Sequence, residues 1–203
     1  DAIGEGNDTI RIFFNGDQNN GSPNDIYYID DIRFVLDGCG EIVEDCTGVT
    51  QDLNIITDFD CQENYNLGND PTINDAPTVQ NPNVSCENRS SNVGRYVDNG
   101  MMPFDNLFIN LNGPFDLSTN STFRMKVLST ELGPILAKLE GGTVPVEVFA
   151  NIVITGEWAE YSFDFSQAVG NNNDKLVLFF NAGEADGTIA DIYYLDDLRF
   201  EAP

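Results

Sequence analysis

The side chains able to do chemistry in this chain are mainly carboxylates. Its 203 residues include 34 Asp plus Glu against 9 Lys plus Arg and no His, a formal net charge of -25. The absence of His excludes a Ser-His-Asp triad, a Cys-His dyad and a His-ligated zinc site. The charge argues against nucleic acid as a partner, because the phosphates would be repelled. Chemistry carried by carboxylate oxygens therefore comes first.

Two pairs of aspartates are the best metal candidates. Asp58 and Asp60 follow an early apolar run, and Asp196 and Asp197 stand together in the last one. Successive strand residues point to opposite faces, so both members of a pair can face one point only at a bulge. If the first and last strands are neighbours, the four carboxylates predict a structural Ca²⁺ site, since Ca²⁺ takes about six to eight oxygen ligands. The alternative is a solvated acidic turn.

Aromatic side chains are the second candidate, because sugars stack on aromatic faces flanked by hydrogen-bonding groups. The residues predicted to be exposed and to form such a platform are Tyr96, Phe104, Trp158 and Tyr193. Packing in the core or at an edge is the alternative for each of them. At Trp158, which follows Gly-Glu at a strand start, that alternative is favoured.

Cations are scarce, so their placement matters. Arg124 and Lys126 share one face of their predicted strand, and Lys138 could lie beside them. Together they would make the polar floor of a glycan-binding cleft. Pairing with the abundant carboxylates is the favoured alternative.

Catalysis by two carboxylates, as in glycosidases, is rejected. With 34 acidic residues some pair will always have a suitable separation, and nothing in the sequence marks one pair as special. We therefore expect a protein that is not an enzyme.

The four cysteines indicate an oxidising compartment. Cys39, Cys46, Cys61 and Cys86 form no Cys-x-x-Cys pair, which argues against zinc, and an even number favours disulfides. Of three possible pairings we favour Cys39–Cys46 with Cys61–Cys86, because each bond closes a local loop. Free buried thiols are the alternative. No apolar run reaches the roughly 18 residues needed to span a bilayer, so we expect a secreted protein without membrane insertion.

An internal repeat organises the strands that are expected to position these residues. Residues 7–34 (NDTIRIFFNGDQNNGSPNDIYYIDDIRF) align without a gap to residues 173–200 (NDKLVLFFNAGEADGTIADIYYLDDLRF), with 14 identities in 28 positions. Each copy is expected to be a strand pair, and an isolated two-stranded hairpin is marginal in water.

The first copy therefore predicts a modular protein. We expect residues 1–37 to be the C-terminal strands of a preceding repeat, residues 38–48 a linker with a Cys39–Cys46 bond, and residues 49–203 one complete module. Two alternatives are a single divergent domain with two similar hairpins, and strand addition from a neighbouring chain.

Alternation with period two dominates residues 49–203, and helical periodicity is hard to find. Phe123, Met125 and Val127 alternate with polar residues, and so do Tyr161, Phe163 and Phe165. Further strands are expected within residues 53–59, 93–97, 107–111, 135–140, 145–154, 176–180 and 192–200. Eight or more short strands without helical crossovers predict an all-β antiparallel sandwich of the jelly-roll type. Residues 61–89, rich in Asn and Pro, show no periodicity and are expected to be a long tethered insert.

Several of these segments resemble a known family. They are Val93-Gly-Arg-Tyr-Val97, Asp105–Leu111, Ile135–Glu140, Gly156-Glu-Trp158 with Phe163–Phe165, and Tyr193–Leu198. Together they resemble the β-sandwich carbohydrate-binding-type modules of large secreted Bacteroidetes proteins, including laminarinases and surface glycan-binding proteins. The likeness covers residues 52–200, and residues 1–34 match only the C-terminal end of such a module.

This resemblance implies a non-catalytic module that holds a structural calcium and docks an enzyme or a cell on polysaccharide. The Cys-containing insert departs from the family pattern. We expect a glycan-binding or adhesive module of a tandem-repeat extracellular surface protein, with a neutral polysaccharide and neighbouring like modules as partners. The alternative is a purely structural repeat, a spacer or filament subunit without glycan affinity.

Overall fold

The computed structural model describes residues 42, 44–65, 67, 76–98, 100, 102–183, 188 and 190–203. The chain divides into two compact units, Asp1–Leu36 and Asp37–Pro203, and every described residue belongs to the second unit. The opening repeat copy, Cys39 and the start of the expected linker lie outside the described residues. The division of the chain into repeat end, linker and module therefore stays a prediction.

The described residues form an antiparallel β-sandwich. The strands are β1 (Ile55–Thr57), β2 (Thr78–Gln80), β3 (Asn92–Asp98), β4 (Leu107–Asn110), β5 (Thr122–Ser129), β6 (Gly133–Glu140), β7 (Val146–Ile152), β8 (Trp158–Asp164), β9 (Lys175–Phe180) and β10 (Asp191–Glu201), with a short 3-10 turn η1 (Ser166–Ala168) before β9. One sheet has the order β2-β3-β10-β5-β8 with β1 also paired to β10, and the other has the order β4-β9-β6-β7. The all-β sandwich prediction is confirmed. Within the described ranges, no helix has the length and apolar character needed to cross a membrane.

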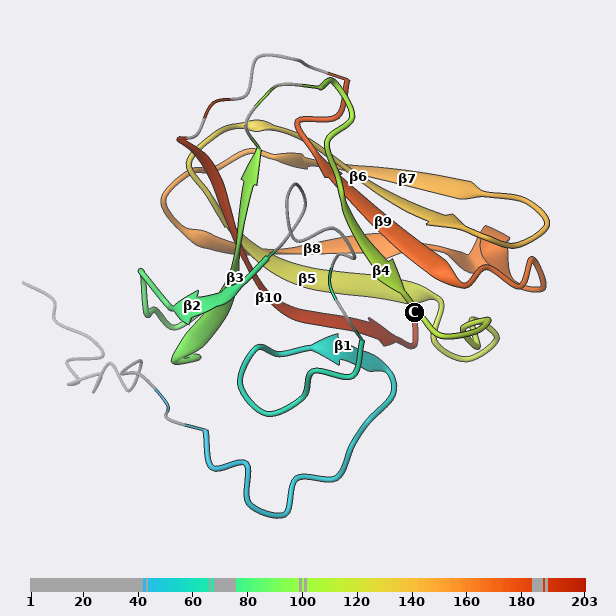
Figure 1. Ribbon diagram of the computed structural model, residues 1–203, viewed down its shortest axis with the longest axis horizontal. Helices are drawn as coiled ribbons and strands as arrows, with labels where there is room; N and C mark the ends of the chain where they lie inside the picture. Colours follow the sequence, from blue (N-terminus) through green and yellow to red (C-terminus); the bar gives the residue numbers. More distant parts are fainter. Residues whose placement is uncertain are drawn as a thin grey trace, which may run out of the picture. The chain divides into compact units, whose positions relative to one another are not determined.

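From β3 to β10 the strands follow a jelly-roll path between the two layers (Figure 1). β3, β10, β5 and β8 are neighbours in the six-stranded sheet, while β4, β9, β6 and β7 make the four-stranded sheet. Along this path only β6 and β7 are both consecutive and paired. Every other connection crosses the sandwich, which is the pattern expected of the predicted jelly roll.

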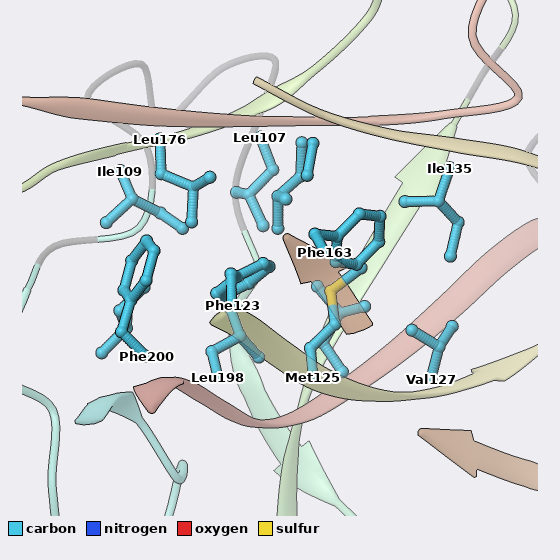
Figure 2. Close-up of a cluster of buried hydrophobic side chains, with 14 of the residues drawn as sticks. Leu107, Ile109, Phe123, Met125, Val127, Ile135, Phe163, Leu176, Leu198 and Phe200 are labelled. Atoms are coloured by element: carbon cyan, nitrogen blue, oxygen red, sulfur yellow. The ribbon is translucent and has the colours of Figure 1, made fainter. Parts of the chain in front are cut away.

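Side-chain alternation along the strands builds the core between the layers. In β5, Phe123, Met125 and Val127 are buried, whereas Arg124 and Lys126 point outward and are half-buried. Complete burial of one such apolar side chain stabilises the fold by about 1.5–3 kcal/mol. Figure 2 shows side chains of the two sheets meeting in this core, among them Leu107, Ile109, Ile135 and Leu176 from the four-stranded sheet and Phe123, Met125, Phe163, Leu198 and Phe200 from the six-stranded sheet.

The repeated segment at residues 173–200 is not a hairpin. It contains β9, which lies between β4 and β6, and most of β10, which lies between β3 and β5 in the other sheet. The expected pairing of these two strands with each other is wrong, because the turn-rich loop between them carries the chain across the sandwich. Each strand of this copy has partners on both sides.

Residues 76–91 of the insert run along the edge and over the outer face of the six-stranded sheet. It contains β2, which pairs with β3 where no strand was expected. The loop at 81–91 then crosses that face, and Trp158 Nε1 donates a hydrogen bond to the carbonyl of Asn83 at 2.8 Å. Trp158, Leu128 and Val93 form a second small hydrophobic cluster there.

The disulfide pairing differs from both predicted bonds. Cys46 is bonded to Cys61, so Cys39–Cys46 and Cys61–Cys86 are wrong, and Cys86 is also disulfide-bonded. The physical reason is a chain reversal after β1. There the Oδ1 atom of Asp58 accepts hydrogen bonds from three consecutive backbone N–H groups, at residues 60, 61 and 62, at 2.7–3.1 Å. This turn returns Cys61 to the segment that leads into β1.

Candidate functional site

The outer face of the four-stranded sheet presents side chains in rows that run across its strands. Strand register decides which residues share a row, because neighbouring strands are antiparallel and outward positions alternate. The first row holds Phe179 of β9, Leu136 of β6 and Phe149 of β7. The second row holds Phe108, Val177, Lys138 and Glu147, and the third holds Asn110, Lys175 and Glu140.

Three phenylalanines, Phe104, Phe149 and Phe179, make one part of this face aromatic. Phe149 and Phe104 are each 59% exposed. The ring of Phe104 stands edge-on to that of Phe179, with centroids 6.3 Å apart and planes at 88°. Phe149 and Phe179 are separated by β6, hence by two strand spacings, or about 9.6 Å. The rings therefore form a row across the sheet.

The loop before β4 holds Phe104 beside the sheet. The backbone N–H of Gly183 donates to the carbonyl of Pro103 at 2.8 Å. The Asn106 side-chain amide donates to the carbonyl of Phe104 at 3.0 Å. The first bond ties the loop to the start of the β9–β10 connection and the second fixes the loop locally, so the exposed Phe104 ring is positioned by the fold.

Charged side chains occupy the rest of the face in alternating sign. Lys138 Nζ lies 3.2 Å from Glu147 Oε1 and 3.6 Å from Glu140 Oε2, and Lys175 Nζ lies 3.5 Å from Glu140 Oε1. Lys175 Nζ also lies 5.8 Å from the centroid of the Phe108 ring. Two cations and two anions cancel locally. An ammonium group has three N–H donors, so Lys138 keeps one for a ligand after meeting both carboxylates.

Of the aromatic residues predicted for a platform, only Phe104 lies on an accessible surface. Tyr96 and Tyr193 are each 1% exposed and belong to the core, where both pack against Phe180. Trp158 is buried under the 81–91 loop. The predicted exposure of Tyr96 and Tyr193 is wrong, because the inward positions of β3 and β10 fall on them. At Trp158 the favoured alternative of packing is the one observed, because the insert covers the side chain.

The predicted cationic cluster divides between the two sheets. Arg124 and Lys126 do share one face, the outer face of the six-stranded sheet, but Lys138 lies in the four-stranded sheet. Lys126 pairs with Asp197 at 2.7 Å, and Arg124 pairs with Glu160 at 2.9 Å. The favoured alternative, pairing with carboxylates, therefore describes all three cations, since Lys138 pairs with Glu147 and Glu140, but Lys138 does not lie beside Arg124 and Lys126.

The outer face of the six-stranded sheet is filled by its own protein contacts. Glu160 accepts hydrogen bonds from both Arg124 and Arg199. Burial raises the pKa of Glu160, but the hydrogen bonds and charges of the two arginines outweigh burial, so the pKa lies below its ordinary value. Arg199 also pairs with Glu201 at 3.1 Å. Since the insert covers another part of this face, the four-stranded sheet carries the open face of the described sandwich.

The four predicted calcium ligands do not come together. Asp58 caps the turn after β1, and Asp60 accepts from the side chain of Asn92 at 2.8 Å. Asp197 pairs with Lys126, and Asp196 accepts from the side chain of Asn88 at 2.8 Å. Within the described ranges no three acidic or Cys side chains converge on a point where a metal ion would fit. This donor set does not fit one Ca²⁺ site, and calcium stays a prediction from the sequence.

A bulge in β10 gives Asp196 an unusual environment. One residue of β5, Met125, opposes two of β10, Asp197 and Leu198, between the pairs Lys126–Asp196 and Arg124–Arg199, and Asp197 has a positive φ of 51°. Asp196 is 0% exposed. Burial and the charge of Asp197 raise the pKa of Asp196 to about 7, although hydrogen bonds from Ser90, Asn88 and the Asp197 backbone act in the opposite direction.

The sequence-based prediction missed three residues on the outer face of the four-stranded sheet. Phe108, Phe149 and Phe179 lie at outward positions of β4, β7 and β9. The available indication was a strand with apolar residues on both faces, as in Lys175–Phe180. A sandwich strand needs only one apolar face, so phenylalanine on the second face marks a surface with another role.

Comparison with solved structures finds carbohydrate-binding modules at low identity. A family 11 module from Clostridium thermocellum, solved with a β-1,3-1,4-mixed-linked tetrasaccharide, has a TM-score of 0.45 and 11% identity, covering 73% of this chain and 95% of its own. A family 29 module from Piromyces equi has a TM-score of 0.43 and 14% identity, with 68% and 87% covered. No family model and no curated protein matches the chain. At these scores the likeness carries no conclusion about a ligand.

Proposed function

We propose that this module is a non-catalytic glycan-binding module that holds a neutral polysaccharide on the outer face of its four-stranded sheet. The observation that carries the proposal is the row of the exposed Phe149, the half-buried Phe179 and, at its edge, the exposed Phe104, beside the ion-paired Lys138. Aromatic surface next to a few fixed polar groups is the usual composition of a ligand site.

The chemistry of the rows suits sugar rings. A pyranose has a face of C–H groups that packs on an aromatic ring and a rim of hydroxyl groups that hydrogen-bond. On this sheet the rings of Phe149 and Phe179 supply the first contact, and Lys138, Glu147 and Asn110 supply donors and acceptors for the second. The ion pairs hold the long side chains in position, so less side-chain freedom is lost when a ligand binds.

Charge supports a neutral ligand. The lysines and glutamates of the face cancel each other, while the whole chain carries a formal charge of -25. A uronate or sulfated polysaccharide would meet a repulsive field that the face does not offset. Neutral polysaccharides, β-glucans among them, meet no such barrier.

The proposed setting is the surface of a cell, within a long extracellular protein made of like modules. The Cys46–Cys61 bond is compatible with an oxidising compartment. The sequence copy at residues 7–34 supports a second module in the same protein, since β9 and β10 of the described copy each need partners on both sides. Binding through several modules would raise avidity on a repeating polysaccharide.

An affinity-gel screen tests the proposal. The chain is run through gels that contain neutral glucans, mannans and galactans or acidic polysaccharides, and we expect retardation only by a neutral glycan. Phe149→Ala should abolish most of the retardation. Leu53→Ala is the control, because Leu53 is 60% exposed and stands two residues before β1, which pairs with β10 of the six-stranded sheet.

A purely structural repeat is the second candidate. It is supported by the internal sequence copy, because an array of like modules has a use as a spacer without any ligand. If no glycan in the screen changes the mobility of the chain, the result favours the structural repeat and rejects the glycan-binding module. Turnover of a glycan, lost on mutation of one carboxylate pair, would reject both.

A further inference from the structure

Strand β7 is an edge strand without the features that usually keep an edge from pairing with another chain. In the four-stranded sheet it pairs only with β6, and no other strand of the described ranges bonds to its outer side (Figure 1). Its seven residues include no Pro, Gly or Lys, and its register with β6 shows no bulge. Natural sheets use such devices because an edge offers unpaired N–H and C=O groups. The outer side of β7 therefore presents a row of free backbone donors and acceptors.

The other edges of the described sandwich are less suited to pairing. β1 and β2 have three residues each and β4 has four, so each of them offers only a short row of backbone groups. β8 has seven residues, but Glu160 and Asp164 are exposed on it, and the 81–91 loop covers its first residue. β7 has one charged residue, Glu147, and Lys138 Nζ of the neighbouring strand lies 3.2 Å from its carboxylate. Among these edges, β7 combines length with local neutrality.

The side chains of β7 are arranged almost symmetrically about Phe149. Read from either end, the strand has an apolar, a polar and an apolar residue before the central aromatic one, in the sequence Val-Glu-Val-Phe-Ala-Asn-Ile. Glu147 and Asn151 stand two positions on either side of Phe149, on the exposed face. Val148 and Ala150 flank it on the side that packs against the core. A strand with this symmetry can pair with a second copy of itself.

We propose that two copies of this chain form a dimer by antiparallel pairing of their β7 strands about a two-fold axis at Phe149. This register pairs all seven residues and places Glu147 opposite the partner's Asn151, an acceptor opposite an amide donor. A register centred one residue away leaves residues of the strand unpaired and sets Glu147 opposite the partner's Phe149 or the partner's Val153, where its carboxylate meets no donor. The occupant is a second copy because the strand complements itself, and such a contact closes into a symmetric dimer.

The pairing joins two four-stranded sheets into one continuous sheet. Backbone hydrogen bonds hold the two edges together, as in other cases of strand addition. The two-fold axis is perpendicular to the sheet, so both copies keep their outer faces on the same side, and the aromatic rows meet at Phe149. This inference goes beyond the proposed glycan face and does not depend on it, because the edge pairs through its backbone without any ligand.

The overall charge of the chain opposes this dimer and makes it sensitive to salt. Each copy has a formal net charge of -25, and salt screens the repulsion between copies over about 8 Å near 0.15 M. The edge itself adds little repulsion, because Lys138 offsets Glu147. The fraction of dimer should therefore rise as salt is added to a solution of low ionic strength.

Sedimentation velocity of the full chain at several protein concentrations, without glycan, tests the proposal. Asn151→Lys puts a cation opposite Glu147 at two places in the dimer, and we expect the dissociation constant to fall by about tenfold. Asn151→Glu puts two carboxylates opposite each other and should raise it by a similar factor. Asn110→Lys and Asn110→Glu are matched controls, because Asn110 is exposed on β4, the other edge of the same sheet. These controls should leave the constant unchanged.

Disulfide cross-linking tests the register. Glu147→Cys and Asn151→Cys should give a covalent dimer when mixed under mild oxidation, and no described cysteine is a free thiol that would compete. Either variant alone should give little dimer, because its two new thiols lie four positions apart, about 13–14 Å along the strands. A wild-type chain that stays monomeric at every protein and salt concentration would overturn the proposal, and so would equal shifts at positions 151 and 110 or absence of the mixed dimer. Neither readout involves glycan, so failure here leaves the glycan face standing.

Discussion

Phe149 of β7 and Phe179 of β9 lie in one row of the four-stranded sheet, each paired in register with Leu136 of the strand between them. No local sequence feature joins these two rings, which are 30 residues apart in the chain. The jelly-roll order of the strands brings them together and turns both outward.

Lys138 should contribute to ligand binding more than to stability. Lys138→Met removes the donor beside the aromatic row, and we expect glycan affinity to fall about tenfold, as for loss of one hydrogen bond to a charged group. The free energy of unfolding should change by less than about 1 kcal/mol, because its ion pairs with Glu147 and Glu140 are partly exposed. Lys126→Met, on the other sheet, should leave affinity unchanged. Equal losses of glycan affinity in the two variants would contradict a binding site on the outer face of the four-stranded sheet.

Trp158 should matter for stability and not for glycan binding. Trp158→Phe removes the hydrogen bond to the Asn83 carbonyl and part of the contact with Leu128 and Val93. We expect unfolding free energy to fall by about 1–3 kcal/mol, measured by chemical denaturation. Affinity-gel mobility should match that of the wild type. A loss of binding with unchanged stability would restore the tryptophan as a platform residue.

The Cys46–Cys61 bond should be visible by peptide mapping and costly to remove. Digestion without reduction should release one linked pair of peptides that contain these two cysteines. The double variant Cys46→Ala/Cys61→Ala should be destabilised by about 3 kcal/mol, the chain-entropy estimate for a loop near 15 residues. Recovery of a Cys61–Cys86 peptide from the oxidised native protein would contradict the pairing.

Asp196 should make stability fall as pH rises through neutrality. Its carboxyl group has a pKa of about 7 in the folded protein, raised from 3.8 by burial and by Asp197. A raised folded pKa favours the protonated form, so its contribution is complete below the unfolded value and is lost as pH passes about 7. Asn88, Ser90 and Asp197 face this group, and Lys126 pairs with Asp197.

The variant Asp196→Asn isolates this effect. Its unfolding free energy should change less between pH 6 and 8 than that of the wild type, whatever the absolute values are, because the titrating group is gone. Denaturant unfolding at several pH values measures both slopes. Parallel pH profiles for the two proteins would show that Asp196 is not the group responsible.

Calcium is tested by melting the protein with and without a chelator. The sequence and the family resemblance predict a lower Tm once the ion is removed, since an ion bound only to the folded state stabilises it. The carboxylates of Asp58, Asp60, Asp196 and Asp197 each accept protein donors and do not form one ligand set. An unchanged Tm would remove calcium from the account of this module.

Much of the fold was predictable because strand alternation is a local property. Phe123, Met125 and Val127 face the core as their spacing indicates, and nine predicted strands have counterparts within a few residues. β2 was missed because its three residues, Thr78–Gln80, are too few to show a period. The pairing of β9 and β10 was wrong because a turn-rich loop looks the same in a hairpin and in a crossing between sheets.

The site was less predictable because exposure depends on contacts between distant segments. Tyr96 and Tyr193 sit at inward positions that an alternating strand alone leaves ambiguous, since either face can be the core face. Trp158 lies on an outward position, but a loop some 75 residues earlier in the chain covers it. Only the sheet order shows that Phe108, Phe149 and Phe179 share one open surface with Lys138.

The most direct test is a nuclear magnetic resonance titration of the labelled chain with an oligosaccharide of whichever neutral glycan retards it. We expect the largest chemical-shift changes at Phe104, Phe108, Lys138, Phe149 and Phe179, and unchanged resonances for Arg124, Lys126 and Trp158. Changes centred on the outer face of the six-stranded sheet would contradict this expectation.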